Sequence, residues 1–238
     1  MNDRLIRISE EIGQGTGFVD VGTDHGYLPL YMIEQGYKGD VFASDINSDP
    51  LNKAIFNAEE AGVNDKIQFM LCDGLSDNVR DKIDTIVIAG MGGDTICGIL
   101  DRAVWCFDNR YKLILQPMTK SEILRYWLSY NDFEITREIL LEDNGSVYQI
   151  ICAVFGKRTE LSDAELFVGP YNKVRTNELF SKRLDKIIKR FEKLLRGLEC
   201  SKDSADKQRI PLNTGIYNQL CAMRDGSFQG GQNNDNSK

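Results

Sequence analysis

The stretch "VDVGTDHGYLPL", residues 19–30, decides the fold. An apolar run that contains Asp20 leads into a glycine-bearing turn, which is typical of a parallel strand entering a nucleotide-binding loop. Asp24 stands where a dinucleotide-binding loop has its middle glycine, and His25, the only histidine in the chain, follows it. A carboxylate at that place repels pyrophosphate but is favourable beside a cation. The stretch therefore predicts a Rossmann-like strand and loop that suits a cationic ligand better than a dinucleotide.

β-rich runs alternate with helical stretches before residue 156, which predicts a parallel sheet with crossover helices. The expected strands are residues 17–22, 39–45, 67–73, 84–90 and 111–117, and the expected helices include 51–62 and 120–131, the latter with Ser121 as candidate N-cap. Two more β-rich runs flank Asp143-Asn144-Gly145, a strong signal for an antiparallel hairpin. This α/β pattern resembles the sheet of class I methyltransferases, which is mostly parallel with an antiparallel last hairpin.

The chain changes character after Gly169-Pro170. Residues 1–170 contain 15 Lys/Arg and 28 Asp/Glu, whereas residues 171–210 contain 12 and 6. A heptad seam predicts a long amphipathic helix there, formed by Phe180, Leu184, Ile187, Phe191, Leu194 and Leu198. We expect this helix to pair with a second one near 206–222 as a helical hairpin. The expected division is a Rossmann-like domain at 1–160, a basic helical domain at 161–224 and a disordered tail at 225–238.

The carboxyl ends of parallel strands share one edge of the sheet, where ligands bind. The sequence places there Asp20, Gly22 and Asp24 after the first strand, Asp45 and Ile46 after the second, Asp73 and Gly74 after the third, Gly90, Met91, Gly92 and Gly93 after the fourth, and Gln116 after the fifth. An acid after the second strand accepts hydrogen bonds from a ribose, which both NAD and S-adenosylmethionine (SAM) carry. SAM has no phosphate and carries sulfonium and ammonium cations, beside which Asp20 and Asp24 are favourable. The acids therefore favour SAM as the ligand. NAD stays the weaker alternative.

Each of these residues also has a plainer interpretation. Any one of the acids can be only an N-cap of the following helix, a lone histidine is most often structural, and the glycines can serve strand–helix packing. Acids at three successive strand ends make the ligand-binding interpretation the stronger one. His25, inside the loop, is then expected to touch cofactor or substrate.

These residues resemble the bacterial tRNA (adenine(22)-N1)-methyltransferases, the TrmK family. The resemblance rests on "VDVGTDHGYLPL", "CDGL" (72–75), "IVIAGMGG" (86–93), "LILQP" (113–117) and "ILLEDNGSVYQI" (139–150). It implies a SAM-binding Rossmann-like domain, a C-terminal helical domain and methylation of an adenine N1 in tRNA. Its cofactor positions fall on Asp20, Gly22, His25, Asp45, Asp73, Gly74 and residues 90–93. Many members have glutamate at position 45, and many have asparagine at the position of Met118.

Methylation makes the adenine cationic, so a nearby carboxylate stabilises the transition state and can accept the N6 proton. Asp24 and Asp94 are the candidates, with Asp24 favoured, and His25 is expected to orient cofactor or base. Tyr27 or Met91 would pack on an adenine that has left its stack. The expected phosphate contacts come from the basic helix, through Lys186, Lys189, Arg190 and Lys193.

Two other functions stay open at this point: methylation of another RNA or a small molecule, and a SAM-binding or tRNA-binding module without turnover. The six cysteines form no CxxC pair, which favours free thiols and argues against a metal site. No signal peptide or membrane-spanning run is recognisable. We expect a cytoplasmic monomer with tRNA as partner.

Overall fold

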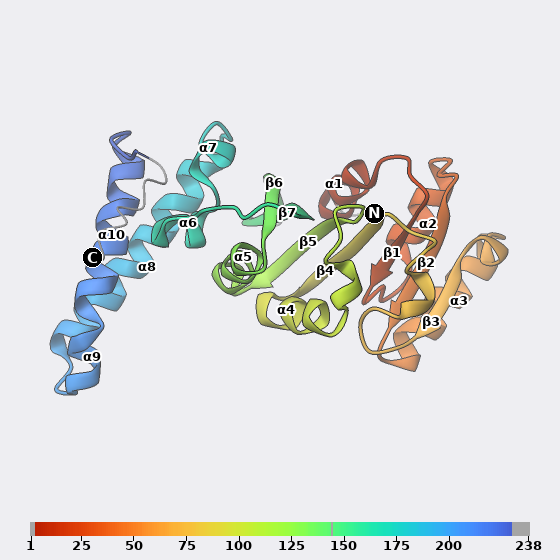
Figure 1. Ribbon diagram of the computed structural model, residues 1–238, viewed down its shortest axis with the longest axis horizontal. Helices are drawn as coiled ribbons and strands as arrows, with labels where there is room; N and C mark the ends of the chain where they lie inside the picture. The colour runs from red at the N-terminus through yellow and green to blue at the C-terminus, as the bar shows by residue number, and fades with distance from the viewer. Residues whose placement is uncertain (1–2, 144, 230–238) are drawn as a thin grey trace.

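The computed structural model describes residues 3–143 and 145–229. Its centre is a seven-stranded sheet with the strand order β3-β2-β1-β4-β5-β7-β6 (Figure 1). The strands are β1 (Gly17–Val21), β2 (Asp40–Asp45), β3 (Gln68–Leu71), β4 (Thr85–Gly92), β5 (Lys112–Thr119), β6 (Phe133–Asp143) and β7 (Ser146–Phe155). Strands β1 to β5 pair in parallel, and β7 pairs antiparallel with both β5 and β6. The predicted class I methyltransferase sheet is confirmed.

Helices precede and connect the strands. They are α1 (Asp3–Ile12), α2 (Tyr27–Glu34), α3 (Ser48–Glu60), α4 (Gly93–Arg102) and α5 (Ser121–Tyr130), followed by α6 (Asp163–Val168), α7 (Tyr171–Val174), α8 (Phe180–Cys200), α9 (Ser204–Gln208) and α10 (Ile210–Arg224). The expectation that Ser121 caps α5 is wrong. Lys120 precedes the helix in a left-handed conformation, with φ 54°, and no side chain caps it. The Ser121 hydroxyl instead accepts a hydrogen bond from Arg125 Nη1, at 3.3 Å.

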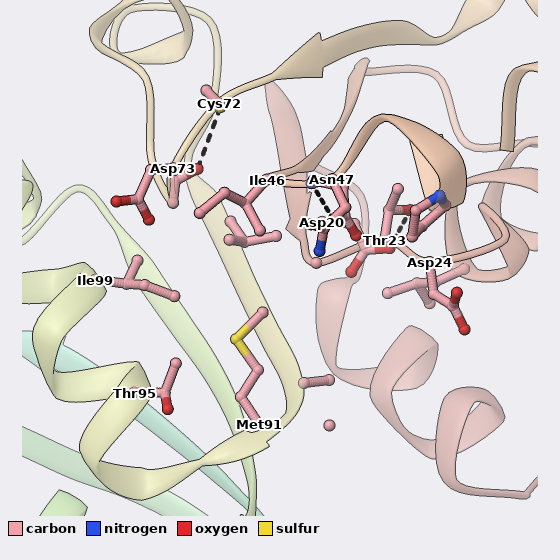
Figure 2. A pocket seen from close by; sticks show the side chains of 18 of the residues that line it. Asp20, Thr23, Asp24, Ile46, Asn47, Cys72, Asp73, Met91, Thr95 and Ile99 are labelled. Carbon is pink, nitrogen blue, oxygen red and sulfur yellow. Dashed lines mark hydrogen bonds between the residues drawn. The ribbon is translucent and has the colours of Figure 1, made fainter. Parts of the chain in front are cut away.

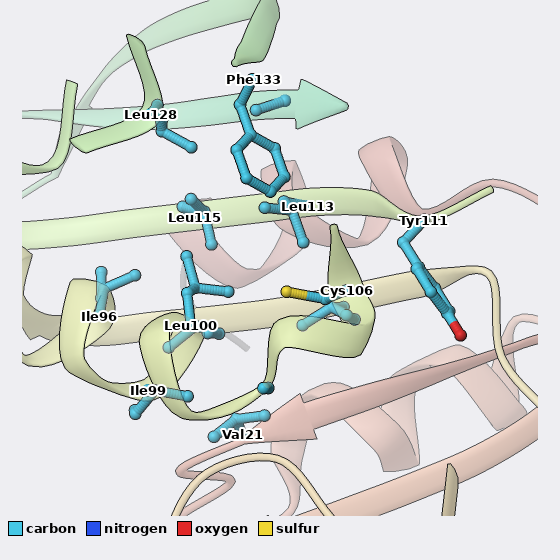
Figure 3. Close-up of a cluster of buried hydrophobic side chains, with 14 of the residues drawn as sticks. Val21, Ile96, Ile99, Leu100, Cys106, Tyr111, Leu113, Leu115, Leu128 and Phe133 are labelled. Atoms are coloured by element: carbon cyan, nitrogen blue, oxygen red, sulfur yellow. The ribbon is translucent and has the colours of Figure 1, made fainter. Parts of the chain in front are cut away.

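Two apolar layers enclose the sheet, because successive side chains of a strand point to opposite faces. On β1, Val19 contributes to the core beneath α4 and α5, whereas Phe18 contributes to the core shared with α1 and α2. Figure 3 shows the first core, where Leu100 and Leu128 from the helices meet the strand residue Leu115. Strands buried on both faces explain why these runs are continuously apolar in the sequence.

The hairpin of β6 and β7 lies next to β5, as the sequence predicts. Asp143 pairs with Ser146, and Gly145 has a φ of 75°, which suits a tight connection. Asn144 lies outside the described residues.

The C-terminal helices share a core of their own with the hairpin. Leu184 of α8, Leu220 of α10 and Leu140 of β6 are buried in it. Ile187 of the predicted seam packs against that core, and its neighbour Ile188 is buried in it as well, because the apolar face of a globular helix is wider than a strict heptad seam. The second helix is split into α9 and α10.

The segment 225–238, which we expected to be disordered, is described only as far as residue 229. Within that part, the Phe228 ring packs edge-on against Tyr171, with ring centroids 5.3 Å apart.

A buried ion pair joins the sheet to the C-terminal segment. Arg125 of α5 and Glu138 of β6 are both fully buried, and two hydrogen bonds of 3.1 and 2.5 Å connect them. Arg125 Nη1 also donates to the Leu166 carbonyl of α6, at 2.6 Å. Gly169 (φ 101°) passes over Glu138, and a Cβ there would lie 2.7 Å from the carboxylate. This network fixes where the chain leaves the sheet.

All cysteines among the described residues are free. Burial raises the pKa of the Cys97, Cys106 and Cys152 thiols to about 12, so these thiols stay protonated. No helix in the described part of the chain has both the length and the apolar content of a membrane span.

Candidate functional site

A cavity of about 930 Å³ lies at the carboxyl ends of β1 to β4, where the strand order reverses. Its volume is at the upper end of the usual range for small-molecule sites. Most of the predicted cofactor residues line it: Asp20, Gly22, Asp45, Ile46, Asp73, Gly74, Gly90 and Met91. Asp24, Tyr27 and Asp94 line it too. The geometry thus brings together residues from five segments of the chain.

Asp20 is a buried acid of the site. It is the next-to-last residue of the fully buried strand β1, and its Oδ2 accepts a hydrogen bond from Thr23 Oγ1 at 2.7 Å. Burial, opposed by the Thr23 hydrogen bond and reinforced by the nearby Asp45 charge, raises the pKa of Asp20 to about 6. A buried carboxylate without a cation is costly, so this position favours a cationic ligand.

Asp24 has the backbone conformation that the loop requires. Its φ of 52° is left-handed, a region that Asp and Asn enter more readily than most residues. Its side chain is 70% exposed and lines the cavity, so the carboxylate is available to a ligand.

His25 lies beside Asp24 but is not among the residues that line the cavity. Its Nε2 is 3.6 Å from Asp24 Oδ1, and its ring stacks on Tyr27 with centroids 5.3 Å apart. The His25 carbonyl accepts a hydrogen bond from Asn57 Nδ2 at 2.9 Å, which ties the loop to α3. In this geometry His25 contacts the side chains of Asp24 and Tyr27 and does not itself line the cavity.

The floor of the cavity forms where the loop after β1 meets β4. Gly22 has a φ of 73°, and a Cβ on it would lie 2.2 Å from Met91 Cε. Figure 2 shows the Met91 side chain between the β1 loop and α4, where Thr95 begins the opposite wall. Gln116 lies outside the cavity, and its Oε1 accepts a hydrogen bond from the Gly90 amide at 3.2 Å. Gln116 therefore positions this floor.

The next two strand ends supply further acids. Asp45 is buried, and its Oδ1 accepts a hydrogen bond from the Asn47 amide at 2.9 Å, which leaves Oδ2 for a ligand hydroxyl. Asp73, in the loop after β3, pairs with Arg102 Nη2 at 2.9 Å. Gly74 follows with a φ of 82° and packs against Ile99 of α4. Arg102 and Ile99 line the cavity as well.

The start of α4 contributes an ion pair rather than a free acid. Lys120 Nζ lies 2.5 Å from Asp94 Oδ2, and this hydrogen bond holds the pKa of Asp94 below its usual value. Gly93 cannot carry a side chain, because a Cβ would lie 2.2 Å from the Lys120 carbonyl. Gly92 and Gly93 pack beneath the cavity and do not line it.

The four predicted phosphate-binding cations of α8 are exposed. None of Lys186, Lys189, Arg190 and Lys193 lines the main cavity, whereas Lys186 and Arg190 line a second cavity of about 440 Å³.

Several lining residues carry no signal in the sequence. Arg4 enters from α1, Thr95 from the first turn of α4 and Arg102 from its last turn. None belongs to a recognisable motif, since each reaches the site only through the packing of its helix. Asn47 lies two residues after Asp45, and the strand-end rule that selected Asp45 and Ile46 could also have found it.

The cavity as a whole suits a cation-bearing ligand with a ribose. Five acidic and two basic side chains are among its described lining residues. The left-handed glycine at position 22 lets a ligand approach the backbone closely. In the part of the chain that the structure describes, no group of three or more His, Cys, Asp or Glu side chains is placed to hold a metal ion.

Comparison with known proteins identifies relatives over nearly the whole chain. The family model described as tRNA (adenine(22)-N(1))-methyltransferase matches residues 18–219. The Bacillus subtilis protein of that name is 29% identical over 216 residues, which cover 88% of this chain and 91% of that protein. The crystal structure of the B. subtilis m1A22 tRNA methyltransferase TrmK has a TM-score of 0.85 at 27% identity and covers 94% of this chain and 99% of that one.

Two similar structures contain ligands. A Streptococcus pneumoniae protein in complex with S-adenosyl-L-methionine has a TM-score of 0.79 at 27% identity, with 94% of this chain and 99% of that chain covered. Mycoplasma capricolum TrmK in complex with S-adenosyl-homocysteine has a TM-score of 0.78 at 27% identity, with coverages of 94% and 98%.

Proposed function

The chain belongs to the tRNA (adenine(22)-N(1))-methyltransferase family, and from this premise we propose that it transfers a methyl group from SAM to N1 of adenine 22 in tRNA. One observation carries the proposal beyond family membership. The cavity at the switch point of the sheet is acidic, includes a buried carboxylate, and has left-handed glycines where a ligand meets the backbone. That combination fits SAM better than a pyrophosphate-bearing cofactor, whose negative charge the acids would repel.

The residues present fit SAM group by group. Asp20 is placed to neutralise a ligand cation, and Asp45 has a carboxylate oxygen left to accept from ribose hydroxyls. Asp73 would accept a hydrogen bond from the adenine amino group, while Arg102 holds its carboxylate in place. When bound, SAM supplies a methyl group that its sulfonium has already activated. The protein therefore contributes mainly position and electrostatics.

Asp24 is better suited than Asp94 to respond to the charge that develops on the adenine. The Asp94 carboxylate already pairs with Lys120, and its lowered pKa makes it a weaker base. Asp24 lines the cavity with a largely exposed carboxylate. We assign it to stabilise the adenine cation and to accept the N6 proton. His25 and Tyr27 then hold the loop that carries Asp24.

The remaining features concern the partner. The excess of basic residues between 171 and 210 favours contacts with the tRNA backbone, and the volume of the main cavity leaves room for a flipped adenine beside the cofactor. We propose that the protein acts as a cytoplasmic monomer, with residues 1–160 binding cofactor and target base and residues 161–224 binding tRNA.

Incubation with methyl-labelled SAM and unmodified bacterial tRNA tests this proposal. We expect label in tRNA, released as 1-methyladenosine after digestion to nucleosides. Tight SAM binding without label in any tRNA would overturn it. Label in small molecules of a cell extract, and not in tRNA, would indicate the alternative acceptor class.

A further inference from the structure

A second cavity, of about 440 Å³, lies between α8 and the edge of the sheet. Its walls come from the end of β5, the start of α5, the start of β7 and one face of α8. Residues that matter for its chemistry include Met118, Lys120, Tyr148, Gln149, Arg183 and Lys186. Its volume falls within the range of small-molecule sites, about 300–1,000 Å³.

The second cavity adjoins the cofactor cavity through a thin wall. Arg4, which lines the cofactor cavity, donates to the Met118 sulfur at 3.3 Å and lies over the Tyr148 ring at 5.5 Å. Lys120 of the second cavity pairs with Asp94 of the first. The walls of the two cavities are therefore in direct contact.

The two cavities have opposite charge. Among the described lining residues, the cofactor cavity has five acidic and two basic side chains, whereas the second has one acidic and five basic ones. Lys182 and Arg190 pair with Glu142 and Glu122. Lys186 has no ion-pair partner among the described residues. The second cavity thus suits an anion, and phosphate is the anion that an RNA substrate provides.

The wall of the second cavity also contains polar groups without partners. Gln149 is 6% exposed, and among the described residues nothing donates a hydrogen bond to its Oε1. Arg183 donates through Nη2 to the Phe167 carbonyl at 2.8 Å, but its buried Nε has no acceptor in that part of the chain. Buried polar groups are normally hydrogen-bonded, so unpaired ones in a cavity wall point to a ligand that satisfies them. One acceptor and one donor match the edge of a nucleobase.

We propose that the second cavity binds a nucleotide of the substrate RNA that neighbours the methylated one, with its phosphate on Lys186 and its base between Tyr148 and Gln149. This inference rests on the proposed function. Extruding the target adenine leaves its neighbour without a stacking partner. A site that holds this neighbour on an aromatic ring repays part of that loss. Gln149 Oε1 is buried in the wall, so the amide has to turn toward the cavity to accept a hydrogen bond from the base.

The charge part of the proposal is tested by Lys186→Met against Lys189→Met. Both lysines are exposed on the same helix, but only Lys186 lines the second cavity. We expect Lys186→Met to raise the KM for unmodified tRNA about tenfold, the loss of one charge-assisted hydrogen bond, and Lys189→Met to raise it at most about threefold. Lys186→Arg should restore much of the affinity. Equal losses in the two Met variants would mean that only the general charge of α8 matters, and would overturn the proposal.

The base contact is tested by Gln149→Leu. Removing a buried polar group without a partner should raise the melting temperature, while kcat/KM for tRNA falls about tenfold because the base loses a hydrogen bond. Unchanged kcat/KM would overturn the base contact. SAM affinity, measured by calorimetry, shows whether the cofactor cavity is intact in each variant. Failure of the wild-type protein to methylate tRNA would instead refute the proposed function, so the two failures are distinguishable.

Discussion

We expect Asp20 to make the affinity for SAM dependent on pH. Its pKa of about 6 lies above the ordinary value of 3.8 for an aspartate, because burial and the Asp45 charge disfavour the carboxylate. A SAM cation needs the carboxylate form, so binding must remove a proton wherever Asp20 is protonated. With a pKa near 6, about nine-tenths of the molecules carry the carboxylate at pH 7 and about one-tenth at pH 5. We therefore expect the SAM affinity to fall about tenfold between these two pH values.

The same shift has a consequence for stability without ligand. A carboxyl whose folded pKa is raised favours folding most below its unfolded pKa, and this contribution is lost as pH rises from about 4 to about 6. The rise in the pKa of Asp20 from 3.8 to about 6 corresponds to a change of about 3 kcal/mol in the free energy of unfolding. Asp20→Asn keeps an acceptor for Thr23 and removes the charge. At pH 7 the ligand-free variant should therefore be up to about 3 kcal/mol more stable than the wild type.

Two measurements check this reasoning. Calorimetric titration with SAM from pH 5 to pH 7 should show the tenfold change and proton release for the wild type, and weak, pH-independent binding for Asp20→Asn. Urea unfolding of both proteins across the same range should show a stability difference that grows with pH. A wild-type affinity that does not change between pH 5 and pH 7, or an Asn variant that binds SAM as tightly as the wild type, would refute the role of Asp20.

Three further predictions concern the loop and the core. Gly22→Ala should weaken SAM binding at least about tenfold, because it adds left-handed strain and pushes atoms into the cavity floor. The control Gly36→Ala, at a φ of 82° with nothing near the added Cβ, should lower the stability of the protein but leave SAM binding unchanged. Equal SAM affinities of the two variants would contradict this prediction. Asp24→Asn keeps the left-handed backbone and should lower the rate of methyl transfer, measured in single-turnover assays, about 100-fold. The SAM affinity of this variant should change little. An unchanged rate would show that Asp24 takes no part in the chemistry. Arg125→Met should lower the free energy of unfolding by about 3–5 kcal/mol, because it leaves Glu138 buried without its partner. Urea unfolding should show that the double variant Arg125→Met/Glu138→Leu recovers much of that loss. A loss below about 1 kcal/mol in the single variant would contradict the structural role of this ion pair.

The sheet and the acidic edge follow from the sequence because parallel strands have their carboxyl ends on one side. Asp20 and Asp45 therefore had to lie near each other once their strands were recognised. The start of α5 could not be predicted from the sequence, because Lys120 adopts a left-handed conformation that is uncommon for a lysine. The seam of α8 follows from the heptad spacing, but the apolar face of the helix is wider than the seam and also includes Ile188.

Side-chain contacts that a helix end makes with other elements could not be predicted from the sequence. Arg102 reaches Asp73 only because the last turn of α4 lies beside the loop that follows β3. The Asp94 pair with Lys120 likewise depends on how β5 ends beside α4. Periodicity indicates which face of a helix is buried, but it carries no information on which side chains meet across helix ends.

The most direct test of the account compares two tRNA transcripts with the wild-type protein and SAM. One contains adenine 22 and the other contains guanine at that position. The account predicts methylation of the first at N1 of adenine 22 and none of the second. Equal methylation of both transcripts, or a methyl group at another nucleotide of the first, would contradict the assignment of adenine 22 as the acceptor.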